Sequence, residues 1–153
     1  MGIIPDPAKS TILGLNPVLE QRITCREPIS VTIDNLPTNR KFRLWEYRAS
    51  HSLLVIRSRR PNEGGKNIDL FFIDVAYLAS PTFLDEITLD GPTNEEIQAV
   101  EAAIGQPLNP QQSVYILVAG DRRFTVAALT VRVEENEDDG WLESPISRHL
   151  GLN

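Results

Sequence analysis

Three hydrophobic runs follow one another between residues 40 and 79, and each has the pattern of a β-strand. The first run, 42–49, places Phe42 and Leu44 on one face and Trp45 and Tyr47 on the other. Large side chains on both faces are typical of a central strand, or of one whose second face meets a partner. The other two runs cover residues 53–56 and 68–78.

Two short segments separate these runs and favour reversals of the chain. Residues 49–52 are few enough for a hairpin loop. The pair Gly64-Gly65 adopts positive φ without steric cost, which suits a second reversal. We therefore expect an antiparallel meander at the centre of the architecture.

Further strands are predicted on both sides of the meander. The run 29–34 is β-branched and alternates apolar with polar residues, as a half-buried strand does. Residues 114–119 and 124–133 flank a Gly120 turn and predict a second hairpin. Residues 84–90 suggest one more short strand.

A single helix is predicted at residues 93–104. Thr93 and Glu96 have the spacing of a capping box, and acidic residues in the first turn complement the helix dipole. Ile97, Val100 and Ile104 form one apolar stripe, and Gly105 is placed to end the helix. The stripe is expected to face the core.

Together these elements predict one α+β domain over residues 1–153, with a mainly antiparallel sheet of about five to seven strands. Residues 1–28 hold four prolines among scattered apolar residues, which predicts an irregular N-terminal arm packed on the domain. Residues 134–140 are too acidic to continue a buried strand. We therefore expect 134–153 to form an acidic loop and a C-terminal segment that docks through its apolar residues.

Composition indicates a folded protein, because 41% of the residues are hydrophobic and 24% are charged. The one cysteine, Cys25, has no partner for an internal disulfide, and a small buried group is the favoured interpretation over a reactive thiol. The sequence has no run of about 18 apolar residues and no signal-peptide pattern at its start. We expect no membrane span and a cytoplasmic location.

The formal net charge of −6 is unevenly distributed along the chain. Residues 1–66 carry 11 Lys and Arg against 6 Asp and Glu, whereas residues 67–153 carry 4 against 15. Such an imbalance marks a charged partner surface in some proteins, although folding can interleave the two halves.

No catalytic fingerprint is present, and we expect no cofactor and no metal site. The sequence lacks phosphate-binding glycine loops, GxSxG and HExxH, and its two histidines are too few for a multi-histidine centre. An enzyme or small-ligand site would need His51, Asp69 and Asp74 to converge. A turn histidine, and an ion pair between Asp69 and an arginine of the adjacent strand such as Arg57, are the simpler interpretations.

A basic and aromatic set lies in the hairpin 40–60. Cations for phosphates and rings for stacking are typical of nucleic-acid sites, so nucleic acid or a phosphate ligand is an alternative, disfavoured by the acidic total charge. The candidate binding residues are Arg43, Trp45, Tyr47, Arg48, Arg57 and Arg59.

An acidic set follows the second hairpin and is a candidate surface for a basic partner. It does not match the register of an EF-hand loop, and a solvated loop is the simpler interpretation. Its members are Glu134, Glu135, Glu137, Asp138 and Asp139.

The preferred hypothesis is a non-enzymatic protein-interaction module, such as an acidic binding protein of the immunity or inhibitor kind. Complementary charge accelerates the encounter of such a protein with its target. The partner is expected to be another protein or a second copy of the chain.

Overall fold

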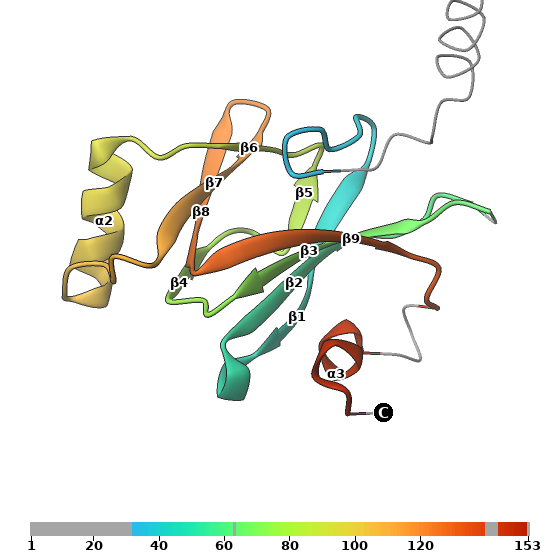
Figure 1. Ribbon diagram of the computed structural model, residues 1–153. Coiled ribbons are helices and arrows are strands. Elements are labelled where there is room, and N and C mark those ends of the chain that lie inside the picture. The colour runs from blue at the N-terminus through green and yellow to red at the C-terminus, as the bar shows by residue number, and fades with distance from the viewer. Residues whose placement is uncertain (1–31, 63, 140–143, 153) are drawn as a thin grey trace, which may run out of the picture. The chain divides into compact units, whose positions relative to one another are not determined.

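The computed structural model describes residues 32–62, 64–139 and 144–152. They form nine strands in two antiparallel sheets and two short α-helices (Figure 1), which confirms the α+β class with mainly antiparallel sheet. The strands are more numerous than expected because three of the apolar runs are each divided between the two sheets. The N-terminal arm at 1–28 lies outside the described residues.

Sheet A has the strand order β5-β1-β2-β3-β9, and sheet B has the order β4-β8-β7-β6. The strands of sheet A are β1 (Lys41–Arg48), β2 (Leu53–Ser58), β3 (Asn67–Ile73), β5 (Phe83–Asp85) and β9 (Thr130–Asn136). The strands of sheet B are β4 (Tyr77–Ala79), β6 (Thr88–Asp90), β7 (Ser113–Ala119) and β8 (Arg122–Ala128). The expected meander is present as β1-β2-β3, and the second hairpin is β7-β8.

The chain passes from one sheet to the other at four places: the loop from β4 to β5, and three short breaks within apolar runs of the sequence. Asp74 (φ 56°) separates β3 from β4, Glu86 (φ 29°) separates β5 from β6, and Leu129 separates β8 from β9. The runs 68–78, 84–90 and 124–133 were each expected to be one strand, and this expectation was wrong. A run that is apolar throughout is compatible with a buried strand and equally with two strands of different sheets, so its pattern does not show the break.

The main core lies between the two sheets. Sheet A contributes Phe42, Leu54, Ile56, Ile68, Leu70 and Phe72, and sheet B contributes Leu117, Val126 and Ala128. Backbone hydrogen bonds hold the two neighbouring crossings together, since Ala76 N–H donates to Ala127 O at 2.8 Å and Leu129 N–H donates to Ile73 O at 2.9 Å. The two sheets therefore share one continuous core.

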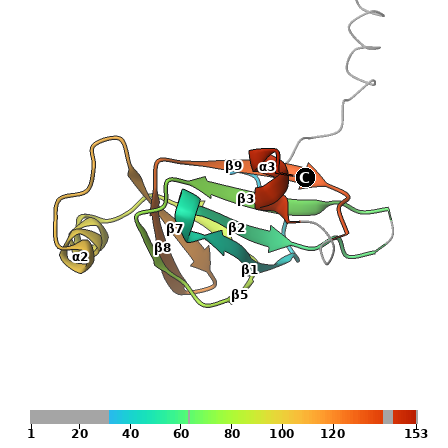
Figure 2. The ribbon, with the colours of Figure 1, turned by 90° about the horizontal axis from the view of Figure 1, so that it is seen from below.

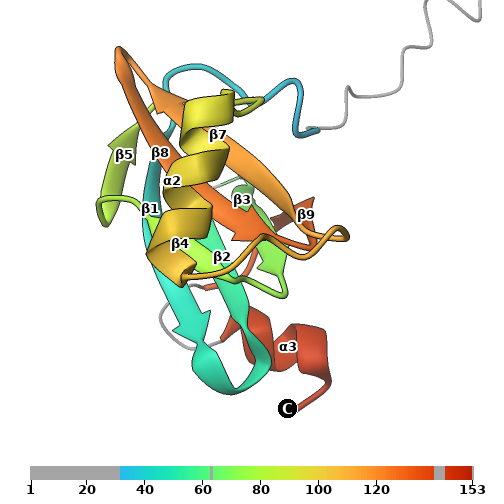
Figure 3. The ribbon, with the colours of Figure 1, turned by 90° about the vertical axis from the view of Figure 1, so that its left-hand side faces the viewer.

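Each helix covers the outer face of one sheet. Helix α2 (Asn94–Ile104) packs Ile97 and Val100 against Val114, Ile116 and Ala127 of sheet B, and Figure 3 shows it crossing in front of β7 and β8. The predicted capping box at Thr93 and the glycine cap at Gly105 are both confirmed. Neither helix of the described ranges is long and apolar enough to cross a lipid bilayer.

The second helix, α3 (Pro145–Leu150), lies on the outer face of sheet A (Figure 2). Its Ile146 is fully buried with Leu53, Val55 and Phe71, and Leu150 packs against the same group. The expectation that the C-terminal segment docks by apolar contacts is confirmed for these residues, while 140–143 lie outside the described ranges.

Two of the expected boundaries were wrong. Residues 32–35 form a turn, in which Asn35 N–H donates to Thr32 O at 3.1 Å, so the strand expected at 29–34 is not formed over its described part. Strand β9 continues to Asn136, so Glu134 and Glu135 belong to the sheet. Among the described strands β9 pairs only with β3, and an edge strand tolerates charged side chains because one of its edges faces water.

Trp45 and Tyr47 were expected to share one face of their strand, but a β-bulge in β1 places them on opposite faces of sheet A. The register with β2 shifts between Leu44 and Glu46. After the shift Tyr47 lies opposite Leu54, a residue of the inner core, while Trp45 packs with the outer cluster beneath α3. The strict alternation assumed from the sequence fails because a bulge inserts one extra residue into the strand.

Candidate functional site

A cleft with many cations opens at the edge of sheet A, where β5, β1 and the end of β2 meet. Its volume is about 340 Å³. We call it the basic cleft, and its lining residues are Asn39, Arg40, Lys41, Arg43, Arg57, Arg59, Pro61 and Phe83. Five of these eight side chains are basic and none is acidic, so the cleft is suited to an anion.

The strand register explains why these side chains converge. Arg43 lies opposite Arg57 on β2 and opposite Phe83 on β5, so all three project from the same face of sheet A. Lys41, two residues before Arg43, projects from that face too. Both cations sit near the half-exposed Phe83 ring, with Lys41 Nζ 5.9 Å and Arg43 Cζ 5.7 Å from its centroid.

Arg57 forms the buried floor of the basic cleft. Its Nε and Nη2 donate to the two carboxylate oxygens of Asp69 at 2.6 and 2.7 Å, and both side chains are fully buried. The expected ion pair between Asp69 and Arg57 is therefore confirmed. Asn136 Nδ2 also donates to Asp69 at 2.8 Å, which fixes the carboxylate further.

The third nitrogen of the Arg57 guanidinium is available. Nη1 is buried and has no hydrogen-bond partner among the described residues. Because Asp69 occupies the Nε and Nη2 side of a planar group, Nη1 lies on the side away from that carboxylate. Trp45 packs on the guanidinium, with its ring centroid 5.3 Å from Cζ, and so restricts the side chain to one position.

Arg40 has a structural role at the rim. It donates to the Ser58 hydroxyl at 2.9 Å and to the carbonyl oxygens of Ser58, Arg59 and Lys66 at 3.2, 3.2 and 2.9 Å. These bonds tie the end of β2 to the start of β3. Partial burial lowers the pKa of Arg40, an effect that the charge of Glu135 opposes.

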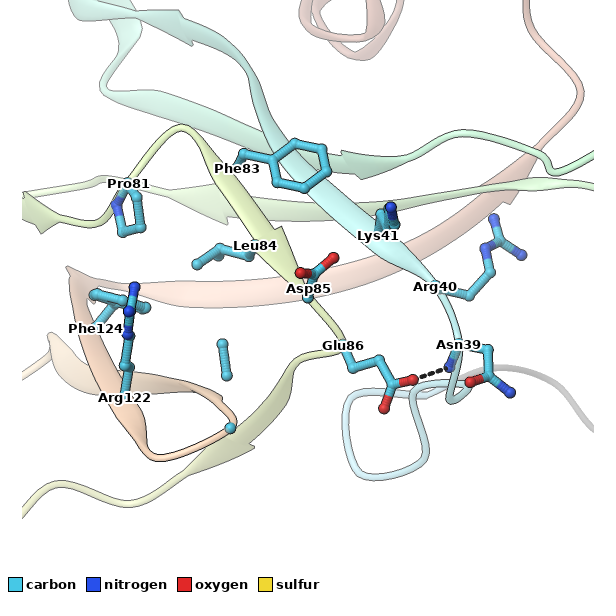
Figure 4. Close-up of a pocket in the computed structure, with 12 residues that line it drawn as sticks. Asn39, Arg40, Lys41, Pro81, Phe83, Leu84, Asp85, Glu86, Arg122 and Phe124 are labelled. Atoms are coloured by element: carbon cyan, nitrogen blue, oxygen red, sulfur yellow. Dashed lines mark hydrogen bonds between the residues drawn. The ribbon is translucent and has the colours of Figure 1, made fainter.

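A second hollow lies on the other side of β5, between this strand and the turn joining β7 to β8. We call it the sheet-end pocket; its volume is about 700 Å³, and Leu84, Phe124 and Ala119 of the core region line it. In Figure 4 Leu84 extends towards Phe124, while the Phe83 ring lies over β1 near Lys41. Its charged residues are Arg40, Lys41, Asp85, Glu86 and Arg122. This mixture of signs favours no single ligand charge.

Contacts of Glu86 fix the backbone between these two hollows. Asn39 N–H donates to Glu86 Oε1 at 3.0 Å, the bond drawn in Figure 4, and Glu86 N–H donates to Arg40 O at 3.0 Å. This pair of bonds holds Glu86 in its positive-φ conformation, where the chain leaves sheet A for sheet B.

The structure brings three of the six basic or aromatic candidates into the cleft and places the others elsewhere. Arg43, Arg57 and Arg59 line the cleft. Trp45 lies behind Arg57, and Tyr47 is 48% exposed at the opposite end of β1. Arg48 instead holds α3, donating to Ser147 Oγ at 2.9 Å and to Glu46 at 3.1 Å.

The acidic candidates are divided between residues that contact α3 and residues that are exposed. Asp138 forms an ion pair with Arg148 of α3, and Glu134 lies 3.9 Å from the same guanidinium. Glu135, Glu137 and Asp139 are exposed. Two of the five residues therefore contact α3, and the other three remain on the surface.

His51, Asp69 and Asp74 do not form a common site. Asp69 lies within β3, whereas Asp74 follows the end of that strand at the break before β4. The Asp69 oxygens are occupied by Arg57 and Asn136, and Asp74 accepts from Gln112 Nε2 at 3.3 Å. His51 lies in the short 3-10 turn Ala49–His51 with Ser50 Oγ 2.8 Å from its Nδ1.

Phe83 is a cleft residue that the sequence pattern did not indicate. It falls between Pro81 and the apolar run 84–90, in a stretch that carried no strand assignment. Its exposure depends on β5 pairing with β1, a contact between residues some 40 positions apart in the sequence.

No family model, curated protein or solved structure matches this chain. Its function must therefore be inferred from the geometry of the described residues. Within those residues no three histidine, cysteine or acidic side chains gather as a metal site would require.

Proposed function

We propose that this protein is a non-enzymatic interaction module that binds an acidic, extended segment of a partner protein at the basic cleft. The observation that carries the proposal is the position of Lys41 and Arg43 beside the exposed Phe83 ring in the basic cleft. Complementary charge would speed the encounter and fix the orientation of an acidic segment. A lone cysteine fits a reducing compartment, so we place this interaction in the cytosol.

An open sheet edge next to the cleft favours an extended partner. Strand β5 pairs only with Lys41, Phe42 and Arg43, and Leu44 N–H donates to Thr82 O at 2.8 Å. Beyond this point β1 has no strand on that side in the described part of the chain. An extended peptide adds to such an edge through main-chain hydrogen bonds, while neighbouring pockets select its side chains.

Nucleic acid is the weaker candidate for the same cleft. Single-strand sites stack successive bases on several rings, whereas this cleft has one exposed ring, and Lys41 and Arg43 both lie within 6 Å of its centroid.

The test is fluorescence anisotropy of the full-length protein with a labelled dodecaglutamate peptide and with a labelled dT12 oligonucleotide. We expect the peptide to bind and its affinity to fall as salt rises from 50 to 300 mM, because exposed charges are screened. Arg43→Glu should weaken binding at least tenfold. Tight binding of dT12 in place of the peptide would replace this proposal with the nucleic-acid one.

Arg132→Glu is the matched control. Arg132 is exposed on the same face of sheet A but on β9, opposite Phe71, and the substitution makes the same change in charge. We expect it to leave peptide binding within twofold of the unmodified protein. Equal losses from the two substitutions would mean that overall charge, and not the basic cleft, attracts the peptide.

A further inference from the structure

We infer that the basic cleft contains a subsite for a phosphoryl group, carried by the partner segment. This inference deepens the proposed function and rests on it for the source of the group. Two observations support it: the available nitrogen of Arg57 at the floor of the cleft, and the charge that surrounds it.

The floor offers a hydrogen-bond donor that no described residue of the chain satisfies. Arg57 is fully buried, two of its three guanidinium nitrogens are taken by Asp69, and Nη1 has no acceptor. A buried donor without a partner is costly, and native structures retain few of them. An oxygen atom of a bound anion would satisfy it.

The donors around this floor match a phosphoryl group better than a single carboxylate. Arg57, Arg43 and Lys41 lie on one face of sheet A and line the same cleft, whose lining residues include no acidic side chain. Asp85, opposite Lys41 in the register, offsets part of their charge. A phosphoryl group carries about −1.5 to −2 at pH 7 and has three acceptor oxygens, so it can accept from all three side chains at once.

Geometry supports the same assignment. Arg43 and Arg57 are direct cross-strand neighbours, and Lys41 lies on the same face of β1. Arginine donors from adjacent strands can bind two oxygens of one tetrahedral group, while a carboxylate has only two oxygens in one plane. We assign Arg57 Nη1 and Arg43 as donors to the phosphoryl oxygens, with Lys41 and Arg59 at the rim.

The test compares three ten-residue peptides of alternating glutamate and valine that differ only at a central phosphoserine, glutamate or serine. Binding to the full-length protein is measured by fluorescence anisotropy. We expect the phosphoserine peptide to bind at least tenfold more tightly than the glutamate peptide, and Arg43→Gln to remove this advantage. Arg132→Gln, the matched control, should preserve it.

A second measurement tests the subsite without any peptide. Inorganic phosphate and acetate are titrated at constant ionic strength while the arginine Nε–H signals are followed by NMR. We expect phosphate, and not acetate, to shift the signals of Arg57 and Arg43 saturably. Arg57→Lys should weaken the phosphate response, and circular dichroism first checks that this variant folds. If it does not fold, Lys41→Gln, at an exposed position, takes its place and should also weaken the response.

The outcomes separate the two proposals. Equal affinity for phosphoserine and glutamate peptides would overturn the phosphoryl subsite and leave the acidic-segment function intact. Failure of every peptide, together with a specific phosphate response, would overturn the proposed function and keep the subsite. Competition by AMP that exceeds that of inorganic phosphate would identify a nucleotide, and not a protein segment, as the source of the group. Absence of any phosphate response would overturn the inference.

Discussion

The buried pair of Arg57 and Asp69 is the residue-scale feature on which the basic cleft depends. Two short hydrogen bonds join the side chains, Asn136 supports the carboxylate, and Trp45 packs on the guanidinium. Replacing a buried ion pair with apolar residues is often neutral for stability, but removing one partner leaves an uncompensated charge. The pair therefore positions a cation more than it stabilises the fold.

Asp69→Asn tests this interpretation. We expect the free energy of unfolding to fall by about 3–5 kcal/mol, because Arg57 then remains buried without its counter-charge. Urea denaturation followed by circular dichroism measures the change, and Asp85→Asn, at an exposed position of β5, should cost less than about 0.5 kcal/mol. A loss below about 1 kcal/mol at position 69 would contradict the buried geometry.

The sequence allowed the Arg57–Asp69 pair to be predicted, because a carboxylate within an apolar strand needs a nearby cation. It did not allow the positions of Trp45 and Tyr47 to be predicted. Their separation depends on one inserted residue in β1, and that bulge is defined by the pairing with β2 and not by the composition of β1 itself.

At the scale of elements, α2 is tied to sheet B by charge as well as by its apolar stripe. Arg123 of β8 donates to both oxygens of Glu96, at 3.2 and 2.9 Å, and to Asp90 at 2.8 Å. The hydrogen bonds from Arg123, and then the backbone bond of the capping box, lower the pKa of Glu96 to about 2. The same arginine lowers the pKa of Asp90.

The pH dependence of the protein's stability tests the ion pair between Arg123 and Glu96. Since the folded pKa of Glu96 is about 2 and its ordinary value is 4.5, its contribution is complete above pH 4.5 and is lost as the pH falls towards 2. We expect Glu96→Gln to lower the melting temperature at pH 7 and to reduce the fall in stability between pH 4.5 and 2. Glu95→Gln, at the exposed neighbouring position, should leave the wild-type slope unchanged. If stability fell equally between pH 4.5 and 2 in Glu96→Gln and in the unmodified protein, the low pKa of Glu96 would be contradicted.

The helix α2 was predictable from local signals, since its capping box, apolar stripe and terminal glycine all lie within 13 residues of sequence. The breaks that divide three apolar runs between the two sheets could not be predicted in this way. Asp74 and Glu86 adopt positive φ although they are not glycines. Aspartate tolerates this conformation better than most residues, but nothing in the local pattern requires it there.

At the scale of the whole described domain, the two sheets are joined by the chain itself. Four pairs of consecutive strands pass from one sheet into the other, and a single core fills the space between the sheets. Neither sheet can lose its packing without exposing the apolar face of the other. We therefore expect both sheets to unfold in one cooperative transition.

Asp74→Val tests this coupling at one of the crossings. A β-branched residue at φ 56° is strained, so we expect a loss of about 1–3 kcal/mol, shared by both sheets. Hydrogen exchange of the Leu70 amide in β3 and the Leu117 amide in β7 should report the same decrease. Asp74→Gly relieves the strain and is the control. A decrease confined to one sheet would show that the sheets unfold independently.

The basic cleft shows what local sequence can and cannot predict at this scale. The hairpin 40–60 was identified as cationic, and Arg43, Arg57 and Arg59 do converge. Phe83 joins them only because β5 pairs with β1, and Arg48 is withdrawn because α3 docks nearly 100 residues later in the chain. Both events are long-range, so no pattern within the hairpin reports them.

The packing of Trp45 on Arg57 also has an entropic consequence. An exposed arginine loses about 1.5–2 kcal/mol of side-chain conformational freedom when a ligand orders it. Arg57 has already lost that freedom on folding, since Asp69 and Trp45 hold it in one rotamer. An anion that reaches the floor of the cleft thus meets a donor that is already ordered, and the entropy lost on binding falls mainly on the exposed side chains at the rim.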